Sequence, residues 1–260
     1  QTTSSVFPQL YLSNFSKLSS SRKIEVEQNI KEAINRFISF QTANGGFGYW
    51  PGDVNDSEWG TNYATHFLIE AERKGYSLPY GMKNKLLSYL RTKARSWQPK
   101  KSRFKYRNQS HEIIQAYRLY ILALANKGEL GAMNRMKENK VLSVNTKWRL
   151  AGAYKLLGQD KVANNLIFGV PTDIEDYKEY SYSYGSSLRD EAMILEVISR
   201  MDDKAKAGIL AKKIADQLGD NSRWMSTQTT AYSLIAMSQF LEGSTTSSQM
   251  KFSYSIHGKQ

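Results

Sequence analysis

The sequence contains no cysteine, which excludes disulfide bonds and thiolate zinc sites within its 260 residues. Its three histidines, His66, His111 and His257, are far apart in the chain and form no metal-ligand motif. No apolar run approaches the roughly 20 residues that a membrane-spanning helix requires. We therefore expect no metal site and no cofactor.

The balance of charge is basic, because 36 Lys and Arg residues against 24 Asp and Glu residues give a formal net charge of +12. Such an excess is typical of proteins that bind nucleic acid, anionic polysaccharide or acidic membrane surfaces. In this chain both signs are interspersed, and the dense basic run is Lys100–Arg107. Interspersed charge is typical of a solvated surface, so we expect no nucleic-acid partner.

Hydrophobic periodicity predicts an all-α fold. Apolar side chains recur at three- and four-residue steps in segments joined by polar or glycine-containing loops. These predicted helices are 6–15, 22–41, 61–73, 80–97, 110–127, 131–140, 146–157, 160–168, 186–201, 202–218 and 227–241. They read as about six weakly similar helical hairpins. An open solenoid and a closed α/α toroid both fit, and the long loops at one end of each hairpin favour the toroid, with its loops converging on one mouth.

The C-terminal tail has a different pattern. Residues 243–249 form a Gly/Ser/Thr linker, and residues 251–258 alternate apolar and polar side chains as a β-strand does. A single strand is not stable by itself. We therefore expect residues 1–242 to form the helical domain, and residues 243–260 to form a linker and the first strand of a following β-domain.

Aromatic residues concentrate in the predicted loops. The glycine turn Asn44–Gly46 is flanked by Tyr49 and Trp50, and Trp59 stands just before the next predicted helix, which Thr61 would cap. Tyr184 lies in a tyrosine-rich loop, and Trp224 lies in the turn before the last helix. Aromatic side chains gathered in exposed loops indicate a binding or reactive site there. We expect these five aromatic side chains, Tyr49, Trp50, Trp59, Tyr184 and Trp224, to frame the mouth.

Several residues would suit an enzyme that acts on polysaccharides. A glycoside hydrolase needs a pair of carboxylates, for which Asp53, Asp56 and Glu58 are candidates, although they equally suit a solvated acidic turn. A polysaccharide lyase needs a base and a neutralising cation, which could come from this set: Asn108, His111, Tyr184 and Arg189. His111 could instead cap a helix or line the cavity.

Arg189 and Asp190 begin a predicted helix. They could form a buried structural ion pair that organises the mouth. Alternatively, Asp190 could be an ordinary acidic residue favoured by the positive end of the helix dipole.

The order of motifs along nearly the whole chain resembles one family. Gln1-Thr2-Thr3-Ser4 followed by an apolar helix resembles the segment just after the thioester motif Cys-x-Glu-Gln of bacterial alpha-2-macroglobulins. The resemblance continues through Asn44–Trp50, Trp59–Tyr63, Gly75–Pro79, Ala116–Ala123, Tyr184–Ala192 and Trp224–Ala231. The terminal segment KFSYSIHGK is similar to the first strand of the β-domain that follows in that family.

This resemblance implies an α/α-toroid thioester domain, complement-like in type, inside a large bacterial protease inhibitor of the periplasm or cell surface. Its partners would be host or foreign proteases and the other domains of the same long chain, whose missing N-terminal part could carry a membrane anchor. Gln1 would be the thioester glutamine, with its cysteine three residues upstream and outside this chain. The domain would act in bacterial defence and would not itself be an enzyme.

In complement-like members of the family a histidine directs acyl transfer toward hydroxyl groups, and His111 lies in about the corresponding region. The resemblance thus makes His111 a candidate catalytic residue. The alternative function, a polysaccharide lyase or glycoside hydrolase on an α/α toroid, predicts an open groove faced by His111 or by paired acids.

Overall fold

The computed structural model describes residues 1–99, 105–201, 203–220, 222 and 224–244. Helices make up its regular structure, and within the described residues the only β-pairings are two isolated bridges, Gln41 with Phe47 and Lys178 with Ser186. The predicted all-α class is confirmed. The predicted β-strand at 251–258 lies outside the described residues, as does part of the basic run at 100–107.

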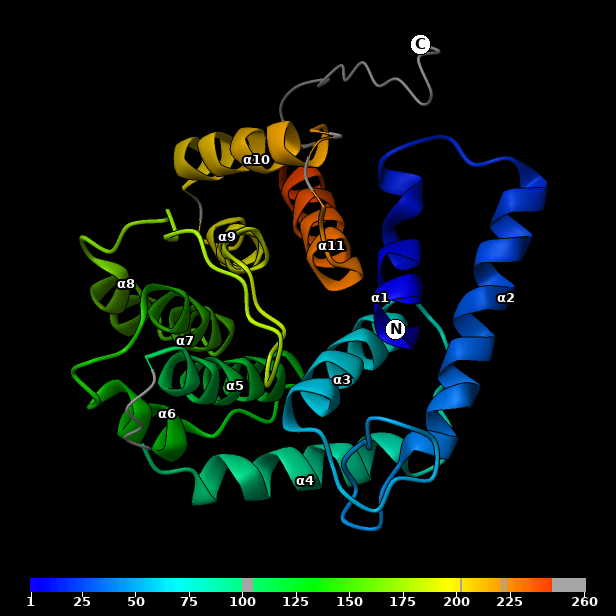
Figure 1. The fold of residues 1–260 in the computed structure, drawn as a ribbon, viewed down its shortest axis with the longest axis horizontal. Helices are drawn as coiled ribbons and strands as arrows, with labels where there is room; N and C mark the ends of the chain where they lie inside the picture. The colour runs from blue at the N-terminus through cyan, green and yellow to red at the C-terminus, as the bar shows by residue number, and fades with distance from the viewer. Residues whose placement is uncertain (100–104, 202, 221, 223, 245–260) are drawn as a thin grey trace.

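The helices form two concentric layers (Figure 1). The inner layer consists of α1 (Thr2–Val6) with the 3₁₀ helix η1 (Phe7–Asn14), α3 (Glu58–Arg73), α5 (Lys105–Leu124), α7 (Val144–Leu156), α9 (Ser187–Ile198) and α11 (Thr227–Ser244). Each inner helix contacts the next, and α11 contacts α1 and η1, so the series of contacts closes on itself. We interpret this ring as the predicted α/α toroid.

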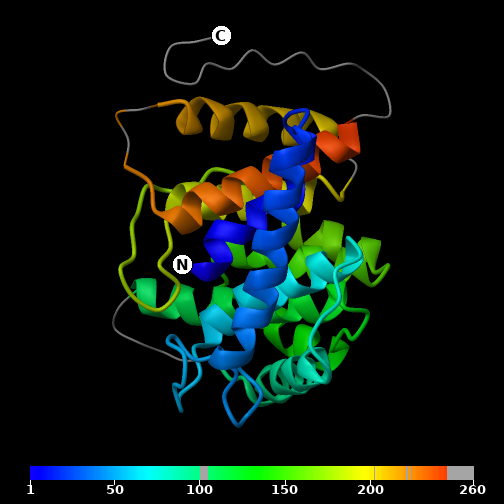
Figure 2. The ribbon, with the colours of Figure 1, turned by 90° about the vertical axis from the view of Figure 1, so that its right-hand side faces the viewer.

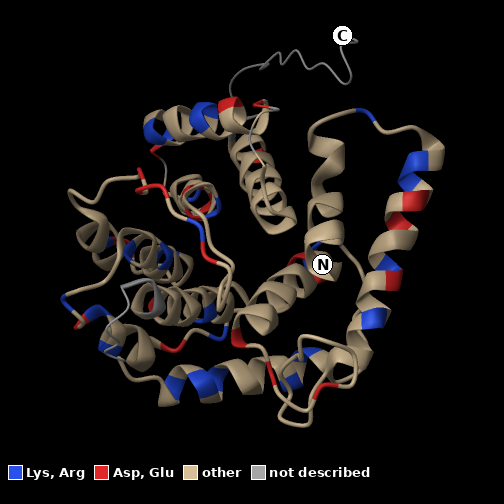
Figure 3. Cartoon of the chain, viewed as in Figure 1, with Lys and Arg blue, Asp and Glu red and all other residues tan. Residues whose placement is uncertain are grey.

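The outer layer covers the ring. It consists of α2 (Ser20–Arg36) with the 3₁₀ helix η2 (Phe37–Phe40), α4 (Met82–Ser96), α6 (Leu130–Lys137), α8 (Asp160–Ile167) and α10 (Lys204–Leu218). Each outer helix packs on an inner neighbour, for example α4 on α3 and α5. Both signs of charge are interspersed along α2 (Figure 3). No helix in the described part of the chain is both long enough and apolar enough to cross a bilayer.

Most helix starts differ by a few residues from the predicted ones, and two of them have a clear physical reason. Helix α3 begins at Glu58, because the Ser57 hydroxyl accepts a hydrogen bond from the backbone N–H of Gly60 at 3.1 Å and caps the helix there. Thr61, the predicted cap, lies inside the helix and accepts from the backbone N–H of Phe47 at 2.9 Å. At the N-terminus, Pro8 has no N–H to donate, and the chain changes from α1 to a 3₁₀ helix at this point.

Charged residues are buried where the inner helices meet. Arg149 donates to Glu196 at 2.8 Å, and the Tyr120 hydroxyl donates to the same carboxylate at 2.6 Å. Nδ1 of His66 lies 2.9 Å from the Tyr117 hydroxyl. Burial lowers the pKa of His66 to about 4. Burial by itself would raise the pKa of Glu196, but the charge of Arg149 brings it down to about 2. The centre of the ring therefore holds an ionised pair beside a neutral imidazole.

The long loops lie together at one end of the ring. The N-terminus is on the same side of the molecule as the loops that precede α3, α9 and α11 (Figure 2). This arrangement brings segments from the start, middle and end of the chain to one mouth.

Candidate functional site

A cavity of about 390 Å³ lies at this mouth, and we call it the Gln1 cavity. Gln1 lines it from the start of α1, with Tyr49 and Trp50 from the loop before α3. Trp59 lines it from the first turn of α3, and Tyr184 lines it from the loop before α9. The fold thus gathers Gln1 and four of the five aromatic residues named from the sequence around one space.

The aromatic residues divide into a buried wall and an exposed rim. The Trp59 side chain is 4% exposed, whereas Tyr49 is 54% exposed and Trp50 is 66% exposed. The ring centres of Tyr49 and Tyr184 are 6.1 Å apart. A hydrogen bond to Tyr184 raises the pKa of the Tyr49 phenol. The two tyrosines therefore bridge the mouth between loops that are far apart in sequence.

The glycine turn before α3 is set by close backbone approach. Gly45 has φ +90°, and a Cβ atom on it would lie 2.9 Å from the carbonyl oxygen of Lys85 on α4. The backbone N–H of Gly48 donates to the Phe40 carbonyl at 2.8 Å. Only glycine combines this conformation with this clearance. The turn fixes the direction in which Tyr49 leaves the helical layer.

Tyr184 belongs to a second shaped loop, residues 177–185, which we call the tyrosine loop. Tyr182 and Tyr184 have φ values of 52° and 50°, in the left-handed region. For residues with a side chain this conformation costs about 1–2 kcal/mol each, so neighbouring groups must hold the loop. Glu179 donates through its backbone N–H to the Gly185 carbonyl at 2.8 Å, which closes the base of the loop.

Arg189 and Asp190 form an ion pair with Nη2 of the arginine 2.6 Å from a carboxylate oxygen, and both side chains are buried. Arg189 also donates to the Ser183 carbonyl at 3.1 Å, inside the tyrosine loop. Asp190 accepts from the Tyr177 hydroxyl at 2.6 Å. The pair thus connects the start of α9 to the tyrosine loop. The cap of this helix is the adjacent Ser186, which accepts from the backbone N–H of Arg189 at 3.2 Å.

Trp224, the fifth aromatic residue, lies beside the Gln1 cavity rather than in it. It lines a neighbouring cavity of about 630 Å³ that shares Tyr184 with the first one. The ammonium group of Lys178 lies 5.6 Å from the centre of a Trp224 ring. The indole is 70% exposed.

His111 does not line the Gln1 cavity. Its ring stacks on Trp97 with centres 5.4 Å apart, and Nε2 donates to the Gln98 carbonyl at 3.1 Å. These contacts join the start of α5 to the end of α4. They give His111 a structural role outside the walls of the Gln1 cavity.

The three acidic candidates of the hydrolase interpretation hold either the loop before α3 or the first residue of α3. Asp53 accepts from the backbone N–H of Trp50 at 2.7 Å. Asp56 accepts from Asn44 at 2.6 Å and also from the Tyr89 hydroxyl. Glu58 pairs with Arg118. These contacts give the three carboxylates a structural role in ordering the aromatic loop and the start of α3.

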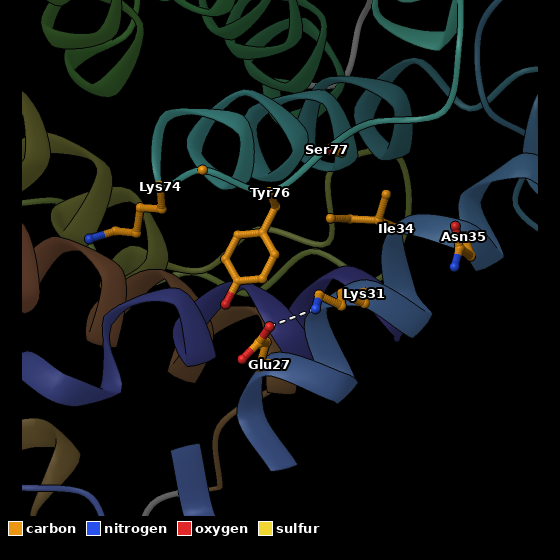
Figure 4. A pocket seen from close by; sticks show the side chains of 8 residues that line it. Glu27, Lys31, Ile34, Asn35, Lys74, Tyr76 and Ser77 are labelled. Carbon is orange, nitrogen blue, oxygen red and sulfur yellow. Dashed lines mark hydrogen bonds and ion pairs between the residues drawn. The ribbon is translucent and has the colours of Figure 1, made fainter. Parts of the chain in front are cut away.

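A further hollow, of about 610 Å³, lies between α2 and the loop that follows α3 (Figure 4). Lys31 on its wall pairs with Glu27 at 2.6 Å, and Lys74 lies 4.5 Å from the centre of the Tyr11 ring. Neither Gln1 nor any of the five aromatic residues named from the sequence lines this hollow.

The known proteins that are similar to this chain in sequence are of one kind. No protein-family model matches the chain. Alpha-2-macroglobulin of Escherichia coli is 27% identical over 241 residues, which are 88% of this chain. The chain is homologous to the bacterial alpha-2-macroglobulins. It spans only 14% of the length of the E. coli alpha-2-macroglobulin.

Solved structures of bacterial alpha-2-macroglobulins superpose on this chain. Salmonella alpha-2-macroglobulin reacted with methylamine is 27% identical, with a TM-score of 0.77 over 92% of this chain and 16% of that chain. E. coli alpha-2-macroglobulin activated by porcine elastase shares the fold at 24% identity, with a TM-score of 0.76 over 92% of this chain and 22% of its own. The resemblance stated from the sequence motifs is therefore confirmed as homology.

One residue that lines the Gln1 cavity was not singled out from the sequence. Gln228, in the first turn of α11, lines the Gln1 cavity and accepts from Nε1 of Trp59 at 2.9 Å. It stands at the end of the Trp224-x-Ser-Thr-Gln segment, which the family resemblance included. The motif contained the residue, but nothing local in the sequence indicates its partner in α3.

Proposed function

We propose that this chain is the thioester-type domain of a bacterial alpha-2-macroglobulin, a broad-spectrum inhibitor that traps attacking proteases. The observation that carries the proposal is the position of Gln1. It lines a cavity walled by Trp59 and rimmed by Tyr49 and Tyr184, in a chain homologous to a protein that has been solved after reaction with methylamine.

The proposed chemistry is one acyl transfer. The side-chain carbonyl carbon of Gln1 would be bonded to the sulfur of a cysteine three residues upstream, outside this chain. An amine of the captured protease attacks that carbon, a C–N bond forms, the C–S bond breaks, and the proton released by the amine ends on the departing sulfur. Each acyl group is used once, so the domain is not an enzyme.

The aromatic walls would preserve the acyl donor until capture. Water is a competing nucleophile, and excluding it from a reactive centre prevents hydrolysis. Trp59 is buried in the wall of the cavity that Gln1 lines, and the rings of Tyr49 and Tyr184 lie 6.1 Å apart at its rim. We propose that these aromatic side chains limit the contact of water with the acyl group that Gln1 would carry.

The proposed partners follow from the relatives. The E. coli protein has been solved after activation by porcine elastase, and we propose host or foreign proteases as targets of the present protein. The relatives are several times longer than this chain, so the other domains of the same long chain are proposed as its permanent neighbours. We place the protein in the periplasm or at the cell surface, where foreign proteases arrive.

The full-length protein provides the test. It is treated with methylamine, and intact mass and thiol titration are recorded together. We expect incorporation of one methylamine and the appearance of one thiol, and neither in a Gln1→Ala variant. Failure of the wild-type protein to gain both would overturn covalent capture through Gln1.

A hydrolase or lyase activity is tested separately by incubating the same protein with anionic and neutral glycans. We expect no shortening of any chain, because the acidic candidates hold the loop and Arg189 is buried in its ion pair.

A further inference from the structure

Gln228 connects the two sides of the Gln1 cavity through one side-chain amide. Its oxygen accepts from Nε1 of Trp59 at 2.9 Å, on the wall that α3 provides. Its nitrogen donates to the carbonyl of Ser183 at 3.0 Å and lies 3.4 Å from the carbonyl of Tyr184, in the tyrosine loop. A primary amide offers one acceptor and two donors, and here both kinds of group are used at once.

The tyrosine loop requires such support. Tyr182 and Tyr184 both have left-handed backbone conformations, which residues with side chains adopt only when their surroundings enforce them. Ser183 lies between them, is buried, and receives donors on its carbonyl from Arg189 and from Gln228. Arg189 holds the loop from α9, the helix that directly follows it, whereas Gln228 holds it from α11.

The conformation of this loop determines where the Tyr184 ring stands. With the loop held, the ring lies 6.1 Å from that of Tyr49, close enough for Tyr184 to raise the pKa of the Tyr49 phenol. Both side chains line the cavity that contains Gln1. Releasing the Tyr184 carbonyl would free the ring to leave this cover.

We propose that Gln228 is a positioning residue that holds Tyr184 against Tyr49 and thereby limits the access of water and small amines to Gln1. This inference rests on the proposed function, because it concerns the acyl group that Gln1 would carry. Gln228 itself does not take part in bond formation, and it acts through Tyr184.

The chemistry of the amide makes the requirement for glutamine specific. In a Gln228→Glu variant the carboxylate would keep the acceptor for Trp59 but would set a negative oxygen against the carbonyls of Ser183 and Tyr184. In a Gln228→Met variant the size is preserved and all three contacts are lost. Both substitutions should loosen the tyrosine loop, and the Glu variant should do so with the Trp59 bond intact.

The test measures thiol release by the full-length protein, both in buffer alone and with methylamine. We expect Gln228→Glu and Tyr184→Ala each to raise both rates by about fivefold, as for removal of one weak barrier to access. The double variant should release thiol no faster than Tyr184→Ala alone, because both changes remove the same cover. Gln159→Glu, an exposed glutamine at the start of α8, is the matched control and should behave as the wild type.

The dependence of the thiol-release rate on the size of the amine gives a second measurement, which a purely structural role of Gln228 would leave unchanged. The advantage of methylamine over benzylamine should shrink in the Gln228 and Tyr184 variants and stay unchanged in the control. If Gln228→Glu does not fold, Gln228→Met removes the same donated bonds to the carbonyls of Ser183 and Tyr184 with a side chain of similar size. It should then show the same loss of discrimination.

The outcomes separate this inference from the function on which it rests. Unchanged rates in Gln228→Glu, or additive effects in the double variant, would overturn the positioning role while leaving the acyl donor in place. A wild-type protein that releases no thiol with methylamine would overturn the proposed covalent chemistry and this inference with it, before any variant is made.

Discussion

The guanidinium carbon of Arg189 lies 4.5 Å from the centre of a Trp59 ring, in the geometry of a cation–π contact. Trp59 walls the Gln1 cavity, so the buried Arg189–Asp190 pair stands directly behind that wall. The indole is attracted by a full positive charge in a dry environment, where such contacts are stronger than at the surface. The ion pair, the indole and the cavity therefore form one connected unit.

Removing the carboxylate of this unit should be severely destabilising. In an Asp190→Ala variant Arg189 would keep its charge in a buried site without its partner, and breaking such a pair costs about 3–5 kcal/mol of unfolding free energy. Urea unfolding followed by circular dichroism measures the loss. Asp216→Ala, which removes the exposed partner of Lys212, is the control and should cost about 0.5 kcal/mol or less. A similar loss in both variants would contradict the argument.

Stability should also fall as the solution is acidified. Burial lowers the pKa of His66 to about 4, below its ordinary value of about 6.5, so between these two pH values the unfolded chain binds a proton that the folded chain does not. The folded state therefore loses up to about 3 kcal/mol relative to its stability at neutral pH. Unfolding midpoints at pH 7, 6 and 5 should show this slope.

The variant His66→Gln isolates the contribution of the imidazole. Glutamine can still bond to the Tyr117 hydroxyl, which lies 2.9 Å from Nδ1 of the histidine, but it does not titrate. Its unfolding free energy should be lower than that of the wild type at pH 7 and should change less between pH 7 and pH 5. An equally steep slope in the variant would assign the acid sensitivity to other groups.

The helical layer could be predicted because its signal is local. The apolar positions of α9, for example, recur at helical spacing within one short segment, and its start was misplaced by one residue because Ser186 and Ser187 both suit a cap. For α3 the competition between Ser57 and Thr61 was decided by Phe47, whose N–H binds the threonine hydroxyl. Such a choice depends on the fold already formed.

The site was predictable only where family motifs or clustered aromatics marked it. Gln1, Tyr49 and Tyr184 were named as residues, but the space between them arises from closure of the ring. The Arg149–Glu196 pair joins two helices and gave no sequence signal beyond two charged residues on otherwise apolar faces. The Gln228–Trp59 bond joins residues 169 positions apart in the chain, and no hydrophobic periodicity predicts such a contact.

Two helical glycines should respond in opposite ways to alanine. A Cβ on Gly152, in α7, would lie 2.7 Å from a Val197 methyl group and 3.1 Å from the Tyr120 ring, because α7 packs closely on α9 and α5 there. We expect Gly152→Ala to cost about 1–3 kcal/mol. Gly208, in α10, has no atom near the same position, so Gly208→Ala should stabilise the chain by up to about 1 kcal/mol. Urea unfolding gives the change in unfolding free energy for each variant. Changes of the same sign in both would refute the packing argument.

Substitution of His111 should change stability without changing the chemistry at Gln1. Its ring stacks on Trp97 and bonds to the Gln98 carbonyl, and it is absent from the walls of the Gln1 cavity. Loss of the stacked pair in His111→Ala should cost about 0.5–1.5 kcal/mol. In the full-length protein, thiol release by methylamine should stay within about twofold of the wild-type rate, as expected when no group that acts in the transition state is removed. The choice between amine and hydroxyl nucleophiles, compared with methylamine and glycerol, should also be unchanged. A His111→Ala protein that keeps its reaction with methylamine but loses transfer to glycerol would place His111 at the reacting carbonyl, against the contacts seen here.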